Sequence, residues 1–209
     1  MRADAQRNLE RLLETARDLV VERGPNVPLD EVARKAGVGI GTLYRRFPDR
    51  DALLEAVVLE ALTATAAAAR RAADEESDAF EALARYLREA LELKVSAVIP
   101  AVLDVLDLTD ADLRAARTAS SEAVERLVDA AHDAGALAKD VTFADVGMML
   151  VRIARPLPGP MTPELKHDLA RRHLELFIRG LRAAPTPEAG ELTGPELSLP
   201  DLRKLTQRP

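Results

Sequence analysis

The side chains best placed to do chemistry in this sequence are hydroxyl and cationic groups near residue 45. Thr42, Tyr44 and Arg45 lie within four residues of one another, and Arg46 follows directly. Hydroxyl and guanidinium groups donate hydrogen bonds to phosphate oxygens, and a guanidinium also pairs bidentately with the edge of guanine. The chemistry that this segment predicts is therefore binding to DNA.

These side chains need a short helix that turns them outward, and the surrounding sequence predicts one. Leu43 and Phe47 form its apolar inner stripe, and Pro48 ends it because the residue before a proline is pushed out of the α region. A preceding helix is predicted by apolar residues at three-and-four spacing: Leu29, Val32, Ala33 and Ala36. Gly37 lies between the two helices, at a sharp turn that favours a residue free to adopt positive φ. The pattern is typical of a helix-turn-helix whose second helix enters a DNA major groove.

The same segment resembles the signature of the tetracycline-repressor (TetR) family of bacterial regulators. The matching positions are Ala33, Ala36-Gly37-Val38, Gly41-Thr42-Leu43-Tyr44, Phe47-Pro48, Arg50 and Leu53. Upstream, residues 12–24 resemble the first helix of that family and its terminating glycine. Pro28 departs from the pattern, because the family often has a Thr or Ser there that caps the second helix and contacts phosphate. The family usually has Lys where this chain has Arg50, a difference that keeps the charge.

The resemblance implies a role in DNA binding for the exposed residues of this segment. The expected contact residues are Lys35, Ile40, Gly41, Thr42, Tyr44, Arg45, Arg46 and Arg50. Thr42 and Tyr44 are expected to hydrogen-bond phosphates, and Gly41 lets the helix approach the DNA closely. Arg45 is expected to reach base edges. Arg46 either reaches a phosphate or stays in water.

The charge distribution agrees with a DNA-reading N-terminal part on an acidic body. The 209 residues carry a formal net charge of −6, which is unusual for a DNA-binding protein. Residues 1–50, however, hold ten Lys and Arg against eight Asp and Glu, so the acidic excess falls on the rest of the chain. Only the part that reads DNA has to be positive near phosphates. An acidic body discourages the remaining surface from lying on DNA.

The sequence has few of the side chains that usually catalyse reactions or bind metals, which argues against an enzyme, a metal site or a cofactor. The sequence has no cysteine and three histidines: His132, His167 and His173. His167 and His173 are six residues apart, which puts them on different faces of a helix rather than at the i, i+4 spacing of a metal-binding helix. The glycines of residues 37–41 resemble a phosphate loop only superficially, since they lie in the turn and the recognition helix. We therefore expect no catalytic residue, no metal and no cofactor.

The sequence predicts a soluble, cytoplasmic protein. Its N-terminus lacks a basic region followed by an apolar stretch, so we expect no signal peptide. The longest apolar-looking runs, such as residues 147–151, are too short to span a bilayer, and Arg152 and Arg155 interrupt any extension. We therefore expect no membrane-spanning segment.

Periodicity and breaker residues predict an all-α fold of about nine helices. Beyond the helix-turn-helix, the expected helices are 3–23, a long helix after Asp49, 77–93, 96–106, 110–134, 142–155 and 163–183. Asp49 and Asp110 are expected N-caps, and Gly135 an expected helix stop. Four prolines in residues 156–163 predict a loop.

Three regions are expected along the chain. Residues 1–48 would form the helix-turn-helix DNA-binding domain with its three helices, and residues 49–184 a larger helical domain for effector binding and dimerisation. Residues 185–209 would form a proline-rich tail, which is expected to be irregular although its scattered leucines could still pack on the body.

The short recognition helix predicts a homodimer. One such helix reads only a few base pairs, so useful affinity needs two of them on one palindromic site. The resemblance implies that the last two helices pack into a four-helix bundle across the two-fold axis. The expected interface residues are Phe143, Leu165, Leu169, Leu176, Phe177 and Gly180. The alternative is that this apolar stripe packs only within one subunit.

The resemblance also implies a small-molecule pocket inside the larger domain. The expected lining is Phe80, Leu83, Leu87, Ile99, Val102, Leu103, Leu106, Leu127, Met148, Met149 and Arg152. Such a lining is aliphatic with deformable methionines, so it favours a compact lipophilic effector or an acyl chain over a flat polyaromatic molecule. Arg152 either points inward and pairs with an acidic ligand, or lies at the dimer edge.

These observations predict a DNA-binding transcriptional regulator, most simply a repressor released from a palindromic operator by a small molecule. Closure of the pocket would shift the long fourth helix and change the spacing of the two recognition helices. The competing interpretation is a helical adaptor for protein interactions whose helix-turn-helix binds no DNA. That interpretation explains the acidic body but not the hydroxyl and cationic groups near residue 45.

Overall fold

The computed structural model describes residues 2–102, 105–106, 110–182 and 197. Within these residues the chain forms nine α-helices, and its extended pairing is limited to an isolated bridge between Leu137 and Arg182. The predicted all-α class is confirmed. Apart from Leu197, the predicted tail lies outside the described residues.

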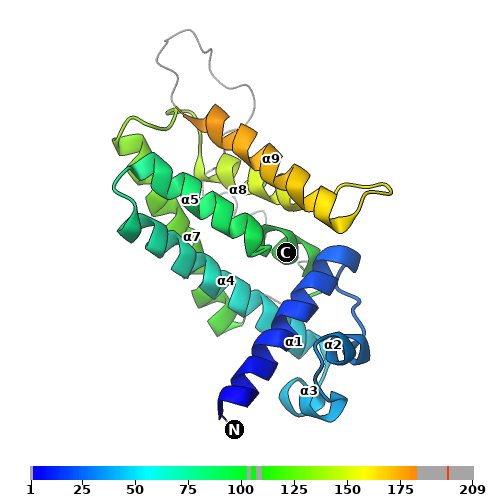
Figure 1. The fold of residues 1–209 in the computed structure, drawn as a ribbon. Coiled ribbons are helices and arrows are strands. Elements are labelled where there is room, and N and C mark those ends of the chain that lie inside the picture. Colours follow the sequence, from blue (N-terminus) through cyan, green and yellow to red (C-terminus); the bar gives the residue numbers. More distant parts are fainter. Residues whose placement is uncertain (1, 103–104, 107–109, 183–196, 198–209) are drawn as a thin grey trace.

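Three helices at one end of the molecule form what we call the N-terminal unit (Figure 1). They are α1 (Arg2–Arg23), α2 (Leu29–Lys35) and α3 (Ile40–Arg46). α1 is followed by Gly24 with φ of 83°, a left-handed conformation that glycine adopts without steric cost. α2 follows Pro28, which offers no capping side chain, but Asp30 and Glu31 lie in its first turn. Carboxylates there interact favourably with the helix dipole, which partly compensates for the missing cap.

α4 (Arg50–Glu75) is a 26-residue helix that joins the N-terminal unit to the rest of the molecule. Asp49 caps it as predicted, because its carboxylate accepts a hydrogen bond from the amide of Ala52 at 2.9 Å. The first part of α4, residues 53–62, packs mainly against the N-terminal unit. The alanine-rich part, residues 66–72, packs in the core of the larger domain, where α4 contacts α5 and α7.

The apolar character of α4 corrects one expectation from the sequence. Among the described residues α4 is the one helix long and apolar enough to cross a membrane, whereas the sequence analysis found every apolar run too short. Of its most apolar 18 residues, 56% are buried inside the protein. Burial of this kind is typical of the core helix of a globular fold.

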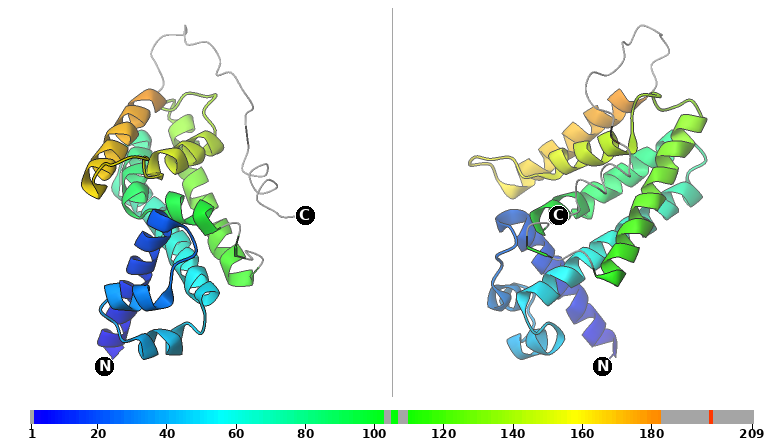
Figure 2. Two further views of the ribbon diagram at one scale, coloured as in Figure 1. Left: turned by 90° about the vertical axis from the view of Figure 1, so that its right-hand side faces the viewer. Right: turned by 180° about the vertical axis from the view of Figure 1, so that it is seen from behind.

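Five further helices build the larger part of the molecule. They are α5 (Ala79–Glu92), α6 (Val95–Val102), α7 (Ala111–Asp133), α8 (Phe143–Ala154) and α9 (Pro163–Leu181). α4, α5 and α7 pack on one another, and α8 and α9 pack on each other and against α5 (Figure 2). The predicted loop at residues 156–163 connects α8 to α9, except that Pro163 is already the first residue of α9.

Helix boundaries follow local capping. α5 begins at Ala79 rather than at Ser77, because the carboxylate of Asp78 accepts a hydrogen bond from the amide of Glu81 at 2.9 Å and makes Asp78 the N-cap. α6 ends at Val102, short of the predicted residue 106. Two expected helix ends are confirmed: Asp110 caps α7, and Gly135 follows α7 with φ of 67°. α8 begins at Phe143 rather than at the predicted residue 142, because Thr142 is its N-cap.

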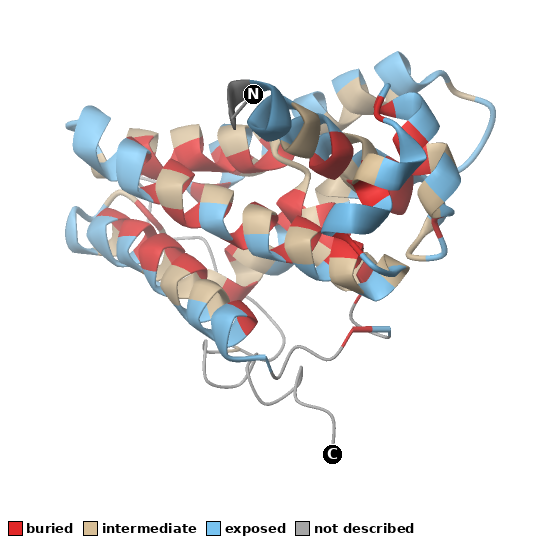
Figure 3. Ribbon diagram, turned by 90° about the horizontal axis from the view of Figure 1, so that it is seen from below, coloured by how far each residue is buried: buried red, intermediate tan, exposed pale blue. Residues whose placement is uncertain are grey.

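The apolar core consists of two clusters, and α6 contributes to the N-terminal one. One cluster lies among α1, α2, α3 and the first part of α4, and the other among α4, α5, α7, α8 and α9. Val98 and Val102 of α6 are buried in the first cluster. Figure 3 shows buried stripes on the facing sides of the helices and exposed residues on their outer sides. Apolar packing therefore continues across the expected boundary at residue 48, through α4 and α6.

Candidate nucleic-acid interface and ligand cavity

α2 and α3 form the helix-turn-helix. Gly37 takes φ of 64° in the turn, and the amide of Val38 donates a hydrogen bond to the carbonyl of Ala33 at 2.9 Å. Leu43 and Phe47 are buried in the N-terminal cluster. This inner stripe fixes α3 on the N-terminal unit and leaves its other face to the solvent.

The outer face of α3 carries most of the residues expected to contact DNA. Ile40 is 43% exposed and Tyr44 51%, which is high for large side chains. Arg45 is exposed, and its Nη2 donates a hydrogen bond to Thr42 Oγ1 at 3.0 Å. A Cβ at Gly41 would meet no atom within 4 Å, so packing within the subunit does not require this glycine. The backbone of α3 is therefore open to close approach from outside.

Two of the expected contact residues, Arg46 and Lys35, have surroundings that differ from those of the other exposed residues of α3. Arg46 borders a depression between α1 and α4, which Leu9 and Leu59 also line. None of the other expected contact residues is among the described residues that line it. Lys35 is exposed, and its Nζ lies 3.6 Å from Oε1 of Glu31. The charge of Lys35 is thus partly paired on its own helix.

Arg50 lies at the N-terminus of α4, beside the loop that precedes α2. Its Nη1 donates a hydrogen bond to Asn26 Oδ1 at 2.8 Å, and its Nε lies 3.8 Å from Asp51 Oδ1. The Nε is buried and has no hydrogen-bond partner within the described chain. Asn26 thus orients the guanidinium at the N-terminus of α4, and helix N-termini favour anions.

A second candidate site is a largely apolar cavity of about 260 Å³ in the larger domain, bounded by α4, α5, α6, α7 and α8. Of the residues expected to line it, Leu87, Ile99 and Met148 do so. Others are buried in the two apolar clusters and do not line it: Phe80, Leu83, Val102, Leu106 and Leu127. Apolar residues are expected both in a core and in the lining of a pocket, so the sequence could not decide which of these residues line the cavity. Leu103 lies outside the described residues.

Arg152 and Met149 are not among the described residues that line this cavity. They border a separate depression between α8 and α9, together with Leu176 and Phe177. Arg152 is exposed there. Of the two alternatives for Arg152, the structure supports the outward one, because Val146, Gly147, Leu150 and Val151 line the cavity from one side of α8, whereas Met149, Arg152 and Ile153 border the outer depression.

Models of two protein families match the chain. The N-terminal domain of the bacterial regulatory proteins of the tetR family matches residues 12–57, and the C-terminal domain of SbtR-like transcriptional regulators matches residues 78–183. The chain belongs to the TetR family. It is a DNA-binding transcriptional regulator.

Solved structures of TetR-family regulators share the fold of most of the chain. A TetR regulator from Mycobacterium vanbaalenii is 32% identical, with a TM-score of 0.61 over 87% of this chain and 99% of that one. SCO0520 from Streptomyces coelicolor is 28% identical, with a TM-score of 0.60 over 84% and 99%. The HTH-type regulator SAUSA300_2515 of Staphylococcus aureus is 31% identical over 96 residues, 46% of this chain and 52% of that protein. The chain thus spans about half the length of the curated relatives that it matches.

The outer face of α8 and α9 in this TetR-family protein exposes large apolar side chains. Leu165 is 47% exposed and Leu176 54%, while Leu169 and Phe177 are half-buried. Gly180 is exposed, and a Cβ there would meet no atom within 4 Å. Phe143, which was expected on this face, lines the cavity instead.

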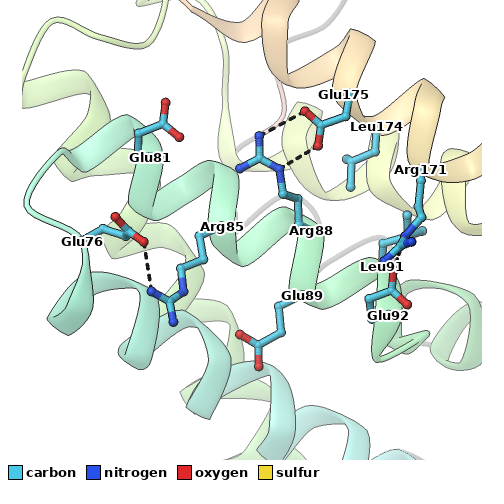
Figure 4. A pocket seen from close by; sticks show the side chains of 10 residues that line it. All are labelled: Glu76, Glu81, Arg85, Arg88, Glu89, Leu91, Glu92, Arg171, Leu174 and Glu175. Carbon is cyan, nitrogen blue, oxygen red and sulfur yellow. Dashed lines mark hydrogen bonds and ion pairs between the residues drawn. The ribbon is translucent and has the colours of Figure 1, made fainter.

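A charged groove of about 590 Å³ lies between α5 and α9 (Figure 4). Arg88 holds Glu175 bidentately, with Nε to Oε1 at 2.6 Å and Nη2 to Oε2 at 3.1 Å. Arg171 Nε donates to Glu92 Oε1 at 2.7 Å. Because acids and bases pair along the groove, we interpret these contacts as a link between α5 and α9 rather than as a binding site.

Most residues that line the cavity were not predicted from the sequence, among them the polar residues Tyr86, Arg117 and Ser120. Arg117 lies three residues before Ser120 on α7, so the two share a helix face, and this polar break in an apolar face was visible in the sequence. Tyr86 gave no such signal, since an aromatic residue on the apolar face of a helix is an ordinary core residue. Among the described residues, no group of His, Asp and Glu could hold a metal ion.

Proposed function

We propose that this protein is a repressor that binds a palindromic operator as a homodimer and releases it when a small molecule occupies the cavity. The observation that carries the proposal is the outer face of α3, where Ile40, Tyr44 and Arg45 are exposed around the open backbone at Gly41. Large side chains exposed together on a short helix are typical of a surface that a partner covers.

The polar groups of this face divide into two roles. Arg45 reads base edges, because a guanidinium pairs bidentately with guanine in the major groove. Thr42 and Tyr44 hydrogen-bond phosphates and set the register of α3 on the duplex. The hydrogen bond from Arg45 to Thr42 supports this division, since it positions the guanidinium on the outer face before DNA arrives.

Arg50 holds a phosphate at the N-terminus of α4. Its guanidinium is already oriented by Asn26, and the buried Nε has no hydrogen-bond partner in the described chain. Arg46 and Lys35 contribute long-range attraction, because the first borders a different depression and the second is paired with Glu31.

Dimerisation uses the outer face of α8 and α9. Leu165 and Leu176 are exposed on it, and Gly180 permits close approach of two backbones. Arg152 lies at the edge of this face, where it can stay in water. A two-fold axis through the face brings two copies of α3 onto one DNA site, which supplies the affinity that one short helix lacks.

Release follows from the position of α6. Ile99 and Pro100 line the cavity, while Val98 and Val102 of the same helix pack against the N-terminal unit. A ligand that pushes on one side of α6 therefore biases the position of the N-terminal unit, and with it the spacing of the two recognition helices. The protein acts in the cytoplasm beside the chromosome, without catalysis and without a cofactor.

Selection from random duplex DNA with the purified full-length protein tests this proposal. We expect the recovered sites to contain two inverted half-sites, and their affinity to fall steeply as salt rises, because bound phosphates release counterions. Recovery of single, non-repeated half-sites would contradict the palindromic operator. Failure to enrich any sequence would favour the adaptor interpretation.

A further inference from the structure

One wall of the cavity carries a patch of polar side chains on α7. Arg117, Ser120 and Ser121 are spaced at i, i+3 and i+4, so they lie on one side of the helix, and all three line the cavity. Leu113 and Val124 line it from the turns before and after. The cavity is therefore amphipathic, with a short polar strip on an otherwise apolar wall.

Two residues with hydroxyl groups lie at the cavity among its apolar side chains. Tyr86 of α5 is 5% exposed and Ser120 of α7 is 6% exposed, and both line the cavity. Thr65 of α4 also lines it, but its hydroxyl donates to the carbonyl of Ala61 at 2.9 Å. A hydroxyl group can both donate and accept a hydrogen bond, so Tyr86 and Ser120 offer polar contacts to a ligand that carries oxygen atoms.

The charge of the lining favours an anion over a cation. Arg117 is the one charged residue among the described residues that line the cavity, and none of them is a carboxylate. Arg117 already makes a polar contact within the protein, but its five N–H groups can serve a second acceptor. Burial raises the pKa of the Tyr86 phenol far above its usual range, so this hydroxyl stays neutral and offers no negative charge to a cationic ligand.

The volume of the cavity limits the size of the ligand. The cavity volume is about 260 Å³, whereas pockets for drug-sized molecules have roughly 300–1,000 Å³. We therefore expect a ligand smaller than a drug-sized molecule. Its apolar part would pack against the side chains of α8 that line the cavity, among them Phe143, Val146 and Leu150.

We propose that the cavity takes a small amphipathic carboxylate, whose aliphatic body packs against α8 and whose carboxylate binds Arg117 and Ser120 on α7. Tyr86 supplies a further hydroxyl for the ligand or for a water that accompanies it. The role of this ligand as the effector rests on the proposed function, whereas its binding does not.

A series of ligands with the same chain and different head groups tests the proposal. Octanoate, 1-octanol and octylamine are titrated into the purified full-length protein by calorimetry at pH 7. We expect octanoate to bind at least tenfold more tightly than octylamine, with 1-octanol between them. Equal or tighter binding of octylamine, or no binding of octanoate at 1 mM, would overturn the proposal.

Variants identify the head-group site. Arg117→Gln is expected to remove most of the preference for octanoate over 1-octanol while leaving the affinity for 1-octanol unchanged, and Arg117→Lys to restore part of it. Arg152→Gln is the matched control, because Arg152 lies outside the cavity and the substitution removes the same charge. An unchanged preference in Arg117→Gln, or an equal loss in Arg152→Gln, would overturn the assignment. Ser120→Ala provides a second, smaller change should Arg117→Gln fail to fold.

Titration of operator DNA separates the two proposals. If the ligand-free protein binds no specific DNA, the proposed function fails, whatever octanoate does. If the protein binds its operator but octanoate shows no preference over octylamine, the ligand inference alone fails. If octanoate binds as expected and leaves the operator affinity unchanged, the carboxylate site stands and its role as an effector fails.

Discussion

The ammonium nitrogen of Lys94 lies 2.7 Å from Oδ1 of Asp18, and this ion pair joins the corner between α5 and α6 to α1. Lys94 is the one non-glycine residue with positive φ in the described chain, at 55°. The helix that follows places Ile99 at the cavity and Val98 in the N-terminal cluster. The ion pair thus lies where the ligand cavity and the N-terminal unit meet.

We predict a small but measurable coupling between these two charges. Asp18→Asn and Lys94→Gln should each destabilise the protein, and their effects should be non-additive by about 0.2–1 kcal/mol, the usual range for exposed ion pairs. A double-mutant cycle of urea unfolding at fixed protein concentration measures this. The control cycle combines Asp18→Asn with Lys139→Gln, on the connection between α7 and α8, and should be additive. Additivity in both cycles would show that the ion pair contributes nothing.

Gly41 is predicted to matter for DNA binding and not for stability. A Cβ at Gly41 meets nothing within the subunit, and Ala is the better helix former, so Gly41→Ala should leave stability unchanged or raise it by up to about 1 kcal/mol. The added methyl group blocks close approach to the DNA backbone and should weaken operator binding by roughly 1–3 kcal/mol. Gly147→Ala, at an equally open position in α8, is the control for stability. Unaltered DNA affinity in Gly41→Ala would place this turn of α3 outside the interface.

The ion pair between Arg88 and Glu175 predicts a pH dependence of stability. The hydrogen bond from the Arg88 guanidinium holds the pKa of the Glu175 carboxyl below its usual range. A lowered pKa in the folded state contributes stability above the unfolded pKa, and this contribution is lost as pH falls through the folded pKa. Arg88→Gln should therefore reduce stability at pH 7 by less than about 1 kcal/mol, because the pair is partly exposed, and the difference should shrink below about pH 4.

Thermal unfolding of the native protein and of Arg88→Gln between pH 3 and pH 7 measures this difference. Glu175→Gln is the matched variant and should follow the same profile as Arg88→Gln. A stability difference that stays constant over this pH range would show that packing, and not the ion pair, accounts for it.

The exposed apolar face of α8 and α9 predicts a dimer that one charge disrupts. Leu176→Glu places a carboxylate at the centre of the proposed interface, where its desolvation is unfavourable, so the dimer should dissociate at least tenfold more readily. Sedimentation over a range of concentrations measures the dissociation. Ile40→Glu, at a similarly exposed residue on α3, is the control and should sediment like the native protein. A monomer in the native protein at all concentrations would refute the interface.

The helices and the helix-turn-helix could be predicted from the sequence because their signals are local. Asp49, Asp110 and Thr142 cap the helices that they precede, and Gly37 forms the turn with positive φ. Because Leu43 and Phe47 form the buried stripe of α3, the opposite face of this helix could be predicted as the exposed one. Local hydrogen bonds and residue spacing decide such features, so one sequence suffices for them.

The cavity could be predicted only in part because its shape depends on contacts between distant segments. Phe143 and Met149 both belong to the apolar α8, yet the first lines the cavity and the second borders the outer depression. Both residues are hydrophobic, so hydrophobicity alone does not distinguish a cavity residue from a residue at the outer depression. Arg152 stood out as a cation in an apolar stretch, whereas Arg117, in a more polar stretch, is the arginine that lines the cavity. Which arginine lines the cavity depends on how α7 and α8 pack on α5.

The central claim is that the outer face of α3 reads DNA through Arg45, and anisotropy titrations with the selected operator and a scrambled duplex test it most directly. Arg45→Ala should lose roughly 1–3 kcal/mol of operator affinity together with part of its preference over scrambled DNA. Tyr44→Phe should weaken both duplexes about equally, because a phosphate contact carries no sequence information. An Arg45→Ala variant that keeps both its affinity and its sequence preference would contradict the account.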